Sequence, residues 1–355
     1  MAEDLVDGEK VMTKENIGII GAGSWGIALA YLLTNNGHDV TVWTRRKEAA
    51  DQFQKDHENK DKLPGVVLPD SVLFTSDLKE AVEGKSILVL VVPSAHLRDT
   101  VELMKPYINN DQIIVNCSKG IEESSLLVMS QVIHDVLGND FPRKNITVLS
   151  GPSHAEEVGK GTPTTIVVGA ISESVAVRLQ NVFMNEVFRV YISPDMKGIE
   201  IGAACKNVIA LAAGIADGLG YGDNTKAALI TRGITEITRL GIAAGGHFET
   251  FAGLSGIGDL IVTCASMHSR NRRAGILIGQ GKTMQEAMDE VHMVVEGVYS
   301  AKAALKLSKL FDVEMPIVEQ VCEILFNDKP AKEAVADLML RDKKVESHKI
   351  EFPEE

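Results

Sequence analysis

The chain has 355 residues, of which 45% are hydrophobic and 24% are charged, and its formal net charge is −13. This length accommodates two domains, and the composition is that of a globular protein. The negative charge argues against a nucleic-acid binder. The four cysteines are far apart and form no C-x-x-C pair, so we expect a reduced cytoplasmic protein without disulfides or a metal site.

The two ends of the chain are expected to lie outside the folded core. Residues 1–14 begin with an acidic segment that does not resemble a signal peptide, and we interpret them as a flexible extension. Residues 342–355 are interpreted as a C-terminal tail. No apolar run approaches the roughly 18 residues of a membrane helix, so no membrane insertion is expected.

The first half of the chain alternates strand and helix patterns. Continuous apolar runs, typical of a parallel sheet covered on both faces, predict its strands. These strands are at 17–20, 40–43, 86–92, 112–116, 146–149, 164–168 and 187–192, with helices at 24–35, 76–84, 95–105, 124–137 and 172–184. The pattern predicts a doubly wound α/β domain of Rossmann type over 15–194.

The pattern changes after Pro194, where strand-like runs become scarce. Helices are predicted at 199–219, 225–244, 283–291, 296–310 and 315–327. We therefore expect an all-α second domain over 195–341. A ligand between the two domains would lie beyond the carboxyl ends of the strands.

A G-x-G-x-x-G pattern, Gly21-Ala-Gly23-Ser-Trp-Gly26, joins the first predicted strand to the first helix. Gly21 permits a tight turn, Gly23 lets a pyrophosphate approach the backbone, and Gly26 lets the helix pack closely on the sheet. The start of the helix favours an anion. The pattern indicates dinucleotide binding; the alternative is a purely structural turn.

The residues after the second predicted strand bear on which dinucleotide is bound. NAD-selective folds usually place an acidic residue there, whereas this strand is followed by Thr44, Arg45 and Arg46. Two guanidinium groups can pair with a 2′-phosphate, which favours NADP(H) while leaving NAD(H) open. The alternative is a solvated basic start to the next helix.

Two further predicted strands are followed by residues suited to chemistry. Lys119 follows one strand and would face the nicotinamide at the carboxyl edge of the sheet, or else it is a surface lysine. Gly151 and Ser153 follow another strand, where Gly permits close approach of a ligand and Ser supplies a hydroxyl. The alternative for these two is a simple turn.

Lys206 lies in a predicted helix that is apolar nearly all round, so it should be buried. Burial is costly for a lysine unless it is paired or its pKa falls, and such a lysine can exchange a proton with a carbinol oxygen. The alternative is snorkelling from the helix edge. Asp259, in a glycine-rich segment, is the natural partner of Lys206, although it could equally be a helix cap.

A second basic cluster, at 269–273, contains Arg270 and Asn271. Arg270 could hold a phosphate through two hydrogen bonds while Asn271 adds a neutral donor. A basic run can equally be a solvated surface. Val294 and Glu296 are read either as a cofactor contact or as a helix start.

Together these motifs resemble the NAD(P)-dependent sn-glycerol-3-phosphate dehydrogenases of bacterial type. The resemblance runs from about Asn16 to about Leu340 and follows the family's order of motifs. These are Gly21-Ala-Gly-Ser-Trp-Gly26, Asn116-Cys-Ser-Lys-Gly-Ile-Glu122, Leu149-Ser-Gly-Pro-Ser153, Ala204-Cys-Lys-Asn-Val208, Gly256-Ile-Gly-Asp-Leu260, Ser269-Arg-Asn271 and Val295-Glu-Gly297.

The resemblance implies a role for each matching residue. Lys206 would accept the proton during glycerol phosphate oxidation, with Lys119 and Asp259 beside it in the catalytic group. The substrate site would comprise Lys119, Gly151, Ser153, Lys206, Asp259, Ser269, Arg270 and Asn271. The cofactor would contact Gly21, Gly23, Ser24, Trp25, Gly26, Arg45, Arg46, Lys119, Ala155, Arg270, Val294 and Glu296.

The expected reaction is therefore the reversible reduction of dihydroxyacetone phosphate to sn-glycerol 3-phosphate. The resemblance also implies a homodimer and a supply of glycerophospholipid precursors. Two alternatives stay open on the residues alone. One is a dehydrogenase of the same two-domain plan that acts on a hydroxy acid or a phosphogluconate, and the other is a dinucleotide sensor without catalysis.

Overall fold

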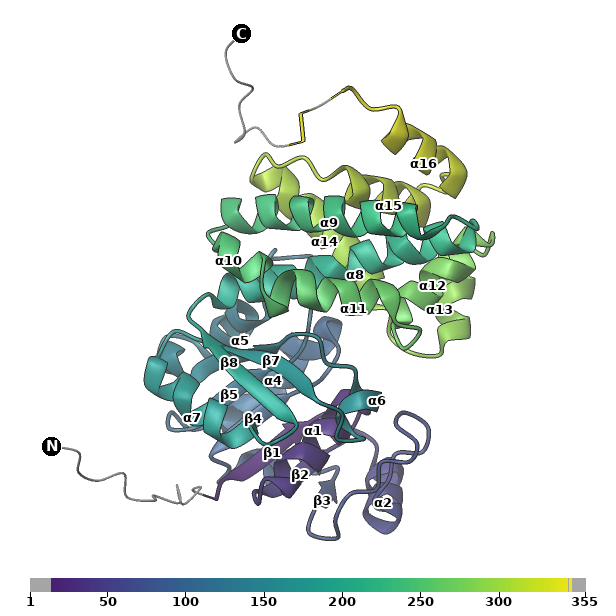
Figure 1. Cartoon of the computed structure of the whole chain (residues 1–355). Coiled ribbons are helices and arrows are strands. Elements are labelled where there is room, and N and C mark those ends of the chain that lie inside the picture. The colour runs from purple at the N-terminus through teal and green to yellow at the C-terminus, as the bar shows by residue number, and fades with distance from the viewer. Residues whose placement is uncertain (1–13, 344, 347–355) are drawn as a thin grey trace, which may run out of the picture.

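The computed structural model describes residues 14–343, 345 and 346. A domain built around a β-sheet carries a domain of helices above it (Figure 1). The predicted extension at 1–14 lies outside the described residues except for Lys14, and so does most of the predicted tail.

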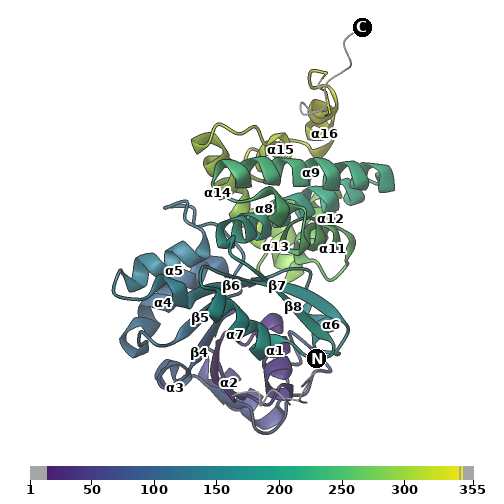
Figure 2. The ribbon, with the colours of Figure 1, turned by 60° about the vertical axis from the view of Figure 1, so that its left-hand side comes forward.

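One eight-stranded sheet, in the order β3-β2-β1-β4-β5-β6-β7-β8, forms the centre of the first domain (Figure 2). Its strands are β1 (Asn16–Ile20), β2 (Asp39–Trp43), β3 (Leu73–Thr75), β4 (Ile87–Leu90), β5 (Ile113–Asn116), β6 (Ile146–Ser150), β7 (Thr164–Ala170) and β8 (Phe188–Ser193). The Rossmann-type α/β fold class is confirmed. Strand β3 and helix α2 (Lys47–Asp56) were not predicted.

The expectation of a parallel sheet is wrong at one pair of strands, because β7 runs antiparallel to β6. The segment between them contains only the single-turn helix α6 (Ala155–Val158). A parallel crossover needs a dozen or more residues, usually with a helix that packs across the sheet, and α6 is too short for that. Strand β8 then pairs parallel to β7, so both strands of this edge run against the rest.

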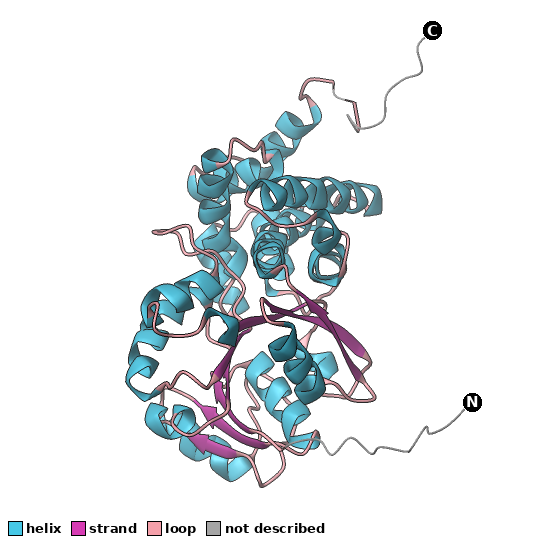
Figure 3. Ribbon diagram, turned by 90° about the vertical axis from the view of Figure 1, so that its left-hand side faces the viewer, coloured by secondary structure: helices cyan, strands magenta, loops and turns pink. Residues whose placement is uncertain are grey.

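The strands are apolar on both faces because helices cover both (Figure 3). Ile17 and Ile19 pack in one core, with α1 (Ser24–Asn35) and α7 (Glu173–Phe183). Ile20 points the other way, into a core with α3 (Leu78–Val82), α4 (Leu97–Met104) and α5 (Met129–Leu137). This alternation follows from the period of two residues along a strand.

Helix α8 (Met196–Gly218) runs through the centre of the second domain, and nearly every residue along it is buried. Against it pack α9 (Asp223–Ala243), α10 (Phe248–Phe251), the π-helical turn η4 (Leu254–Gly258), α11 (Asp259–Ala265), α12 (Arg270–Gly279), α14 (Glu296–Leu310) and α15 (Pro316–Phe326). Helix α13 (Met284–Val291) packs on α12, and α16 (Ala331–Met339) packs on α15. Glycines make close packing possible: a Cβ on Gly275 of α12 would lie 2.3 Å from the Leu211 carbonyl oxygen of α8.

Two helical segments of the described chain reach the length and apolar character of a membrane-spanning helix, so the expectation that none does is wrong. One is α8, whose apolar window is 94% buried inside the protein, as expected of a central core helix. The other, Phe248–Ala265, covers α10, η4 and α11 and is 39% buried.

Candidate active site

The turn between β1 and α1 has the shape of a pyrophosphate cradle. Gly21 has φ +124°, and a Cβ on Gly26 would lie 1.9 Å from the Gly21 carbonyl oxygen. Gly23 differs, because a Cβ there would meet no atom within 4 Å. Helix α1 has neither a side-chain cap nor an acidic residue in its first turn. The turn therefore leaves open space beside uncapped backbone N–H groups, which fits an anionic pyrophosphate.

Most of the other predicted residues of the first domain follow the carboxyl ends of strands, at the edge of the sheet that faces the helical domain. Lys119 follows β5, and Gly151 and Ser153 follow β6. Arg45 and Arg46 follow β2, where both are exposed and neither forms an ion pair with another described residue. Carboxyl ends of parallel strands are the usual ligand site of such a sheet.

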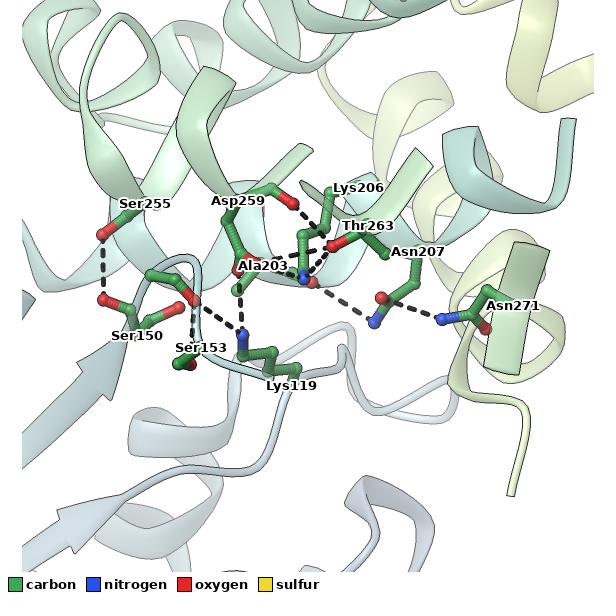
Figure 4. A network of polar contacts seen from close by, with 11 residues as sticks. Lys119, Ser150, Ser153, Ala203, Lys206, Asn207, Ser255, Asp259, Thr263 and Asn271 are labelled. Atoms are coloured by element: carbon green, nitrogen blue, oxygen red, sulfur yellow. Dashed lines mark hydrogen bonds and ion pairs between the residues drawn. The ribbon is translucent and has the colours of Figure 1, made fainter. Parts of the chain in front are cut away.

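Helix α8 places Lys206 in the interior, directly above this edge. Lys206 is only 5% exposed. Its Nζ donates to Asp259 Oδ1 at 2.6 Å and to Thr263 Oγ1 at 2.7 Å (Figure 4). An ammonium group has three donors, and among the described residues no further acceptor takes the third. Lys206 can therefore donate to a substrate oxygen without giving up a partner.

Asp259, the first residue of α11, lies between two lysines. Its Oδ2 accepts from Lys119 Nζ at 2.8 Å while Oδ1 accepts from Lys206. Burial acts to raise the pKa of Asp259, but the two ammonium groups outweigh it and hold that pKa below its usual value. The three groups therefore carry a net charge of +1 in their ionised forms.

The pKa of Lys206 is lowered to about 8. Burial is the largest cause, since it penalises the charged ammonium, and the nearby Lys119 acts in the same direction. Asp259 opposes both. A pKa near neutrality allows the group to give up and take back a proton at physiological pH.

Thr263 was not singled out from the sequence, although it lies one helical turn after Asp259. Its hydroxyl accepts from Lys206 and donates to the Asp259 backbone carbonyl at 2.5 Å. Residues four apart on a helix share a face, so the Asp259–Thr263 spacing is a signal that could have revealed this contact.

A second set of contacts lies beside the first, where α12 and α14 begin (Figure 4). Asn271 Nδ2 donates to Asn207 Oδ1 at 3.0 Å, and Asn271 Oδ1 accepts from the Gly297 backbone N–H at 2.8 Å. Asn207 follows Lys206 on α8 and was also not predicted. Ser269 is the N-cap of α12, with its hydroxyl accepting from Arg272 N at 3.2 Å.

Arg270 is not joined by a hydrogen bond to the Lys119–Asp259–Lys206 group and forms no ion pair with a described carboxylate. Burial lowers the pKa of its guanidinium, against the opposing effect of Glu296 and Glu156. Glu296, at the start of α14, accepts from the Ser94 hydroxyl at 2.6 Å and from the Ser94 backbone N–H at 3.2 Å. A cation that forms no ion pair within the described part of the chain is suited to an anionic ligand.

The remaining predicted cofactor contacts lie on three different helices or next to them. Ser24 and Trp25 are half-buried in the first turn of α1, Ala155 is buried at the start of α6, and Val294 is half-buried just before α14. No contact among the described residues joins these four to the two lysines.

Comparison with known proteins identifies the family. A family described as NAD-dependent glycerol-3-phosphate dehydrogenase matches with its N-terminal part at residues 16–176 and its C-terminal part at 195–336. The chain belongs to this family. A glycerol-3-phosphate dehydrogenase [NAD(P)+] of Fusobacterium nucleatum is 60% identical over 330 residues, which cover 93% of this chain and 98% of that protein.

Further relatives of the glycerol-3-phosphate dehydrogenase family agree with this assignment. An enzyme of the same name from Agathobacter rectalis is 58% identical over 336 residues, which cover 95% of this chain and 99% of that one. The crystal structure of glycerol-3-phosphate dehydrogenase from Coxiella burnetii superposes with a TM-score of 0.88 at 37% identity, covering 92% of this chain and 99% of that one. The chain is therefore an enzyme of the oxidoreductase class.

The open space at Gly23 leads to a prediction about cofactor binding. Gly23→Ala should weaken NADPH binding at least about tenfold, because the added methyl occupies the space expected for the pyrophosphate. Its folding stability should change by about 1 kcal/mol or less, since the methyl meets no protein atom. Fluorescence titration with NADPH and urea unfolding measure the two effects.

Gly26→Ala is the matched comparison. Its methyl collides with the Gly21 carbonyl oxygen, so this variant should lose stability as well as binding. Unchanged NADPH affinity in Gly23→Ala would show that the pyrophosphate does not approach this glycine.

Proposed function

We propose that this enzyme catalyses the reversible NAD(P)H-dependent reduction of dihydroxyacetone phosphate to sn-glycerol 3-phosphate. The observation that carries this proposal is the buried Lys206, held by Asp259 and Thr263 with one donor unused, above the carboxyl edge of a dinucleotide-binding sheet. Family membership supports the choice of substrate.

Residues of the chain donate the proton to the C2 oxygen and stabilise the negative charge that develops on it. A reduced nicotinamide held by the turn at Gly21–Gly26 would supply the hydride that reduction of the C2 carbonyl needs. Lys206 gives a proton to the developing C2 alkoxide and becomes a neutral amine, and in the oxidation direction it takes that proton back. Asp259 orients Lys206, while Lys119 contributes positive charge at the same place.

The substrate phosphate would bind at the start of α12. Arg270 has no carboxylate partner among the described residues and can hold a phosphate through two hydrogen bonds. Asn271 is fixed by Asn207 and Gly297, so its position is set before substrate arrives. Gly151, Ser153 and Ser269 complete the proposed substrate site. Glu296, Val294 and Ala155, with Ser24 and Trp25, form the proposed cofactor side.

Further parts of the proposal rest on the family resemblance and on the sequence. We propose that the enzyme acts in the cytoplasm as a homodimer, without insertion into the membrane. Its product would supply glycerophospholipid synthesis. For the cofactor we favour NADP(H) over NAD(H), because Arg45 and Arg46 occupy the position where an acidic residue would hold the 2′-hydroxyl of NAD.

Replacing the proposed proton donor tests the mechanism. Lys206→Met should lower kcat for dihydroxyacetone phosphate reduction by about 10²- to 10⁴-fold, the usual contribution of a general acid. NADPH affinity should change little. Steady-state kinetics and NADPH titration measure both, with Lys226→Met as the control because Lys226 pairs with Asp217 and not with Asp259. Full turnover in Lys206→Met would refute the assignment.

The lowered pKa of Lys206 predicts opposite pH profiles for the two directions. Reduction needs the ammonium form, so its rate should fall as pH rises through about 8. Oxidation needs the neutral amine, so its rate should rise over the same interval. Asp259→Asn should move both midpoints to lower pH, because the carboxylate acts to raise the pKa of Lys206. Profiles of kcat/KM, which report the free enzyme, between about pH 6 and 11 test this, and a midpoint near the ordinary lysine value of 10.5 would contradict it.

The two arginines after β2 predict the cofactor preference. Arg45→Ala/Arg46→Ala should lower kcat/KM for NADPH by about tenfold or more, since charge-assisted hydrogen bonds to a 2′-phosphate are lost. The value for NADH should change little. Arg189→Ala, on the exposed side of β8, is the control. An unchanged ratio of NADPH to NADH activity would remove the argument for a 2′-phosphate site.

A further inference from the structure

A buried carboxyl group on α8 has no part in the chemistry described above. Glu200 is 4% exposed and lies six residues before Lys206 on the same helix. It accepts hydrogen bonds from Asn116 Nδ2 at 3.1 Å, from the Ser130 backbone N–H at 2.8 Å and from the Ser130 hydroxyl. These three donors all come from the first domain, so Glu200 ties α8 to the sheet.

Asn116, the last residue of β5, connects Glu200 to the loop that carries Lys119. Its Oδ1 accepts from the Ser118 backbone N–H at 3.0 Å. Its Nδ2 donates to the Ser118 backbone carbonyl at 3.1 Å as well as to Glu200. One amide group therefore holds the peptide groups on both sides of Ser118, and the next residue is Lys119.

These contacts close a ring that begins and ends on α8. From Glu200 the ring passes through Asn116 and the Ser118 backbone to Lys119. Lys119 bonds to Asp259, and Asp259 bonds to Lys206, which is again on α8. Helix α8 therefore carries both Glu200 and Lys206, which are the two ends of this series of contacts. Lys119 lies between them in the series.

We propose that Glu200 is a positioning residue that fixes Lys119 relative to Lys206, acting through Asn116 and the backbone of Ser118. The inference rests on the proposed role of Lys119 in the reaction. It adds a residue that touches neither substrate nor cofactor.

The chemistry of the three donors explains why a carboxylate suits this position. A carboxylate accepts at both oxygens: Oε1 takes the Asn116 amide and the Ser130 backbone N–H, while Oε2 takes the Ser130 hydroxyl. A glutamine side chain would place an NH2 group where one of these oxygens stands, so whatever donates to that oxygen would lose its acceptor. Burial raises the pKa of Glu200 to about 7, against the hydrogen bonds of Ser130 and Asn116, so the acceptor-only form prevails at about pH 8. A hydrophobic replacement would leave the donors unpaired.

The test compares Glu200→Gln with Glu236→Gln at about pH 8. Glu236 is a matched control, since it is also 4% exposed, has a pKa raised to about 7 and accepts from the backbone N–H of Ile317 at 2.9 Å. Both variants should lose stability. Only Glu200→Gln should raise KM for dihydroxyacetone phosphate, by about fivefold or more, and increase hydrogen–deuterium exchange at residues 117–120.

A double-mutant cycle separates positioning from a general structural effect. In a Lys119→Met background, Glu200→Gln should change kcat/KM less than about twofold, because its effect is transmitted through Lys119. Full additivity of the two changes, or unchanged exchange at residues 117–120, would overturn the inference. Asn116→Ala cuts the same link without altering α8 and should reproduce the rise in KM, which keeps the inference testable if Glu200→Gln does not fold.

The same assays distinguish failure of this inference from failure of the proposed function. A wild-type enzyme that does not reduce dihydroxyacetone phosphate would refute the function itself. Wild-type activity in Lys119→Met, with Lys206→Met inactive, would refute the role of Lys119 and this inference with it. Loss of activity in Lys119→Met with wild-type KM in Glu200→Gln and in Asn116→Ala would overturn the inference alone.

Discussion

The site depends on one carboxylate placed between two ammonium groups. Without Asp259, Lys119 and Lys206 would bring two like charges together in a largely buried place, where repulsion is poorly screened. A buried ion pair is stabilised only when its hydrogen bonds are satisfied, and here both carboxylate oxygens have a partner. The remaining charge of +1 lies in a chain of net charge −13, so this group of residues offers a local attraction for an anion.

Close approach of helices is the constraint that brings the residues proposed to bind phosphate to the neighbourhood of Lys206. A Cβ on Gly214 of α8 would lie 2.1 Å from the Arg272 carbonyl oxygen of α12, so side chains larger than hydrogen are excluded at this crossing. Because the two helices touch backbone to backbone, Asn271 reaches Asn207, the neighbour of Lys206. Packing in the helical core therefore sets the distance between the proposed phosphate site and the proposed proton donor.

The sequence predicted the parts of this arrangement that depend on local pattern. The glycine turn, the apolar strands and the buried environment of Lys206 can each be recognised within a short window, because strand and helix periodicity and glycine geometry are local properties. The direction of β7 could not be predicted in this way, since it depends on how the short segment with α6 crosses the sheet. The contacts of Glu200 with Asn116 and Ser130 join residues 84 and 70 positions apart, and no local pattern indicates such a pairing.

Three polar contacts between the domains have a common origin, since each takes a residue from a segment that follows a central strand. Ser94 after β4 meets Glu296, Asn116 at the end of β5 meets Glu200, and Lys119 after β5 meets Asp259. Apolar surfaces can slide past one another with little loss, whereas a hydrogen bond weakens steeply when its distance or angle changes. Directional contacts at these positions therefore fix how the two domains are placed relative to each other beside the proposed site. A buried carboxyl group adds little net stability once its desolvation is counted, so the contribution of Glu200, Asp259 and Glu296 at this boundary is mainly one of orientation.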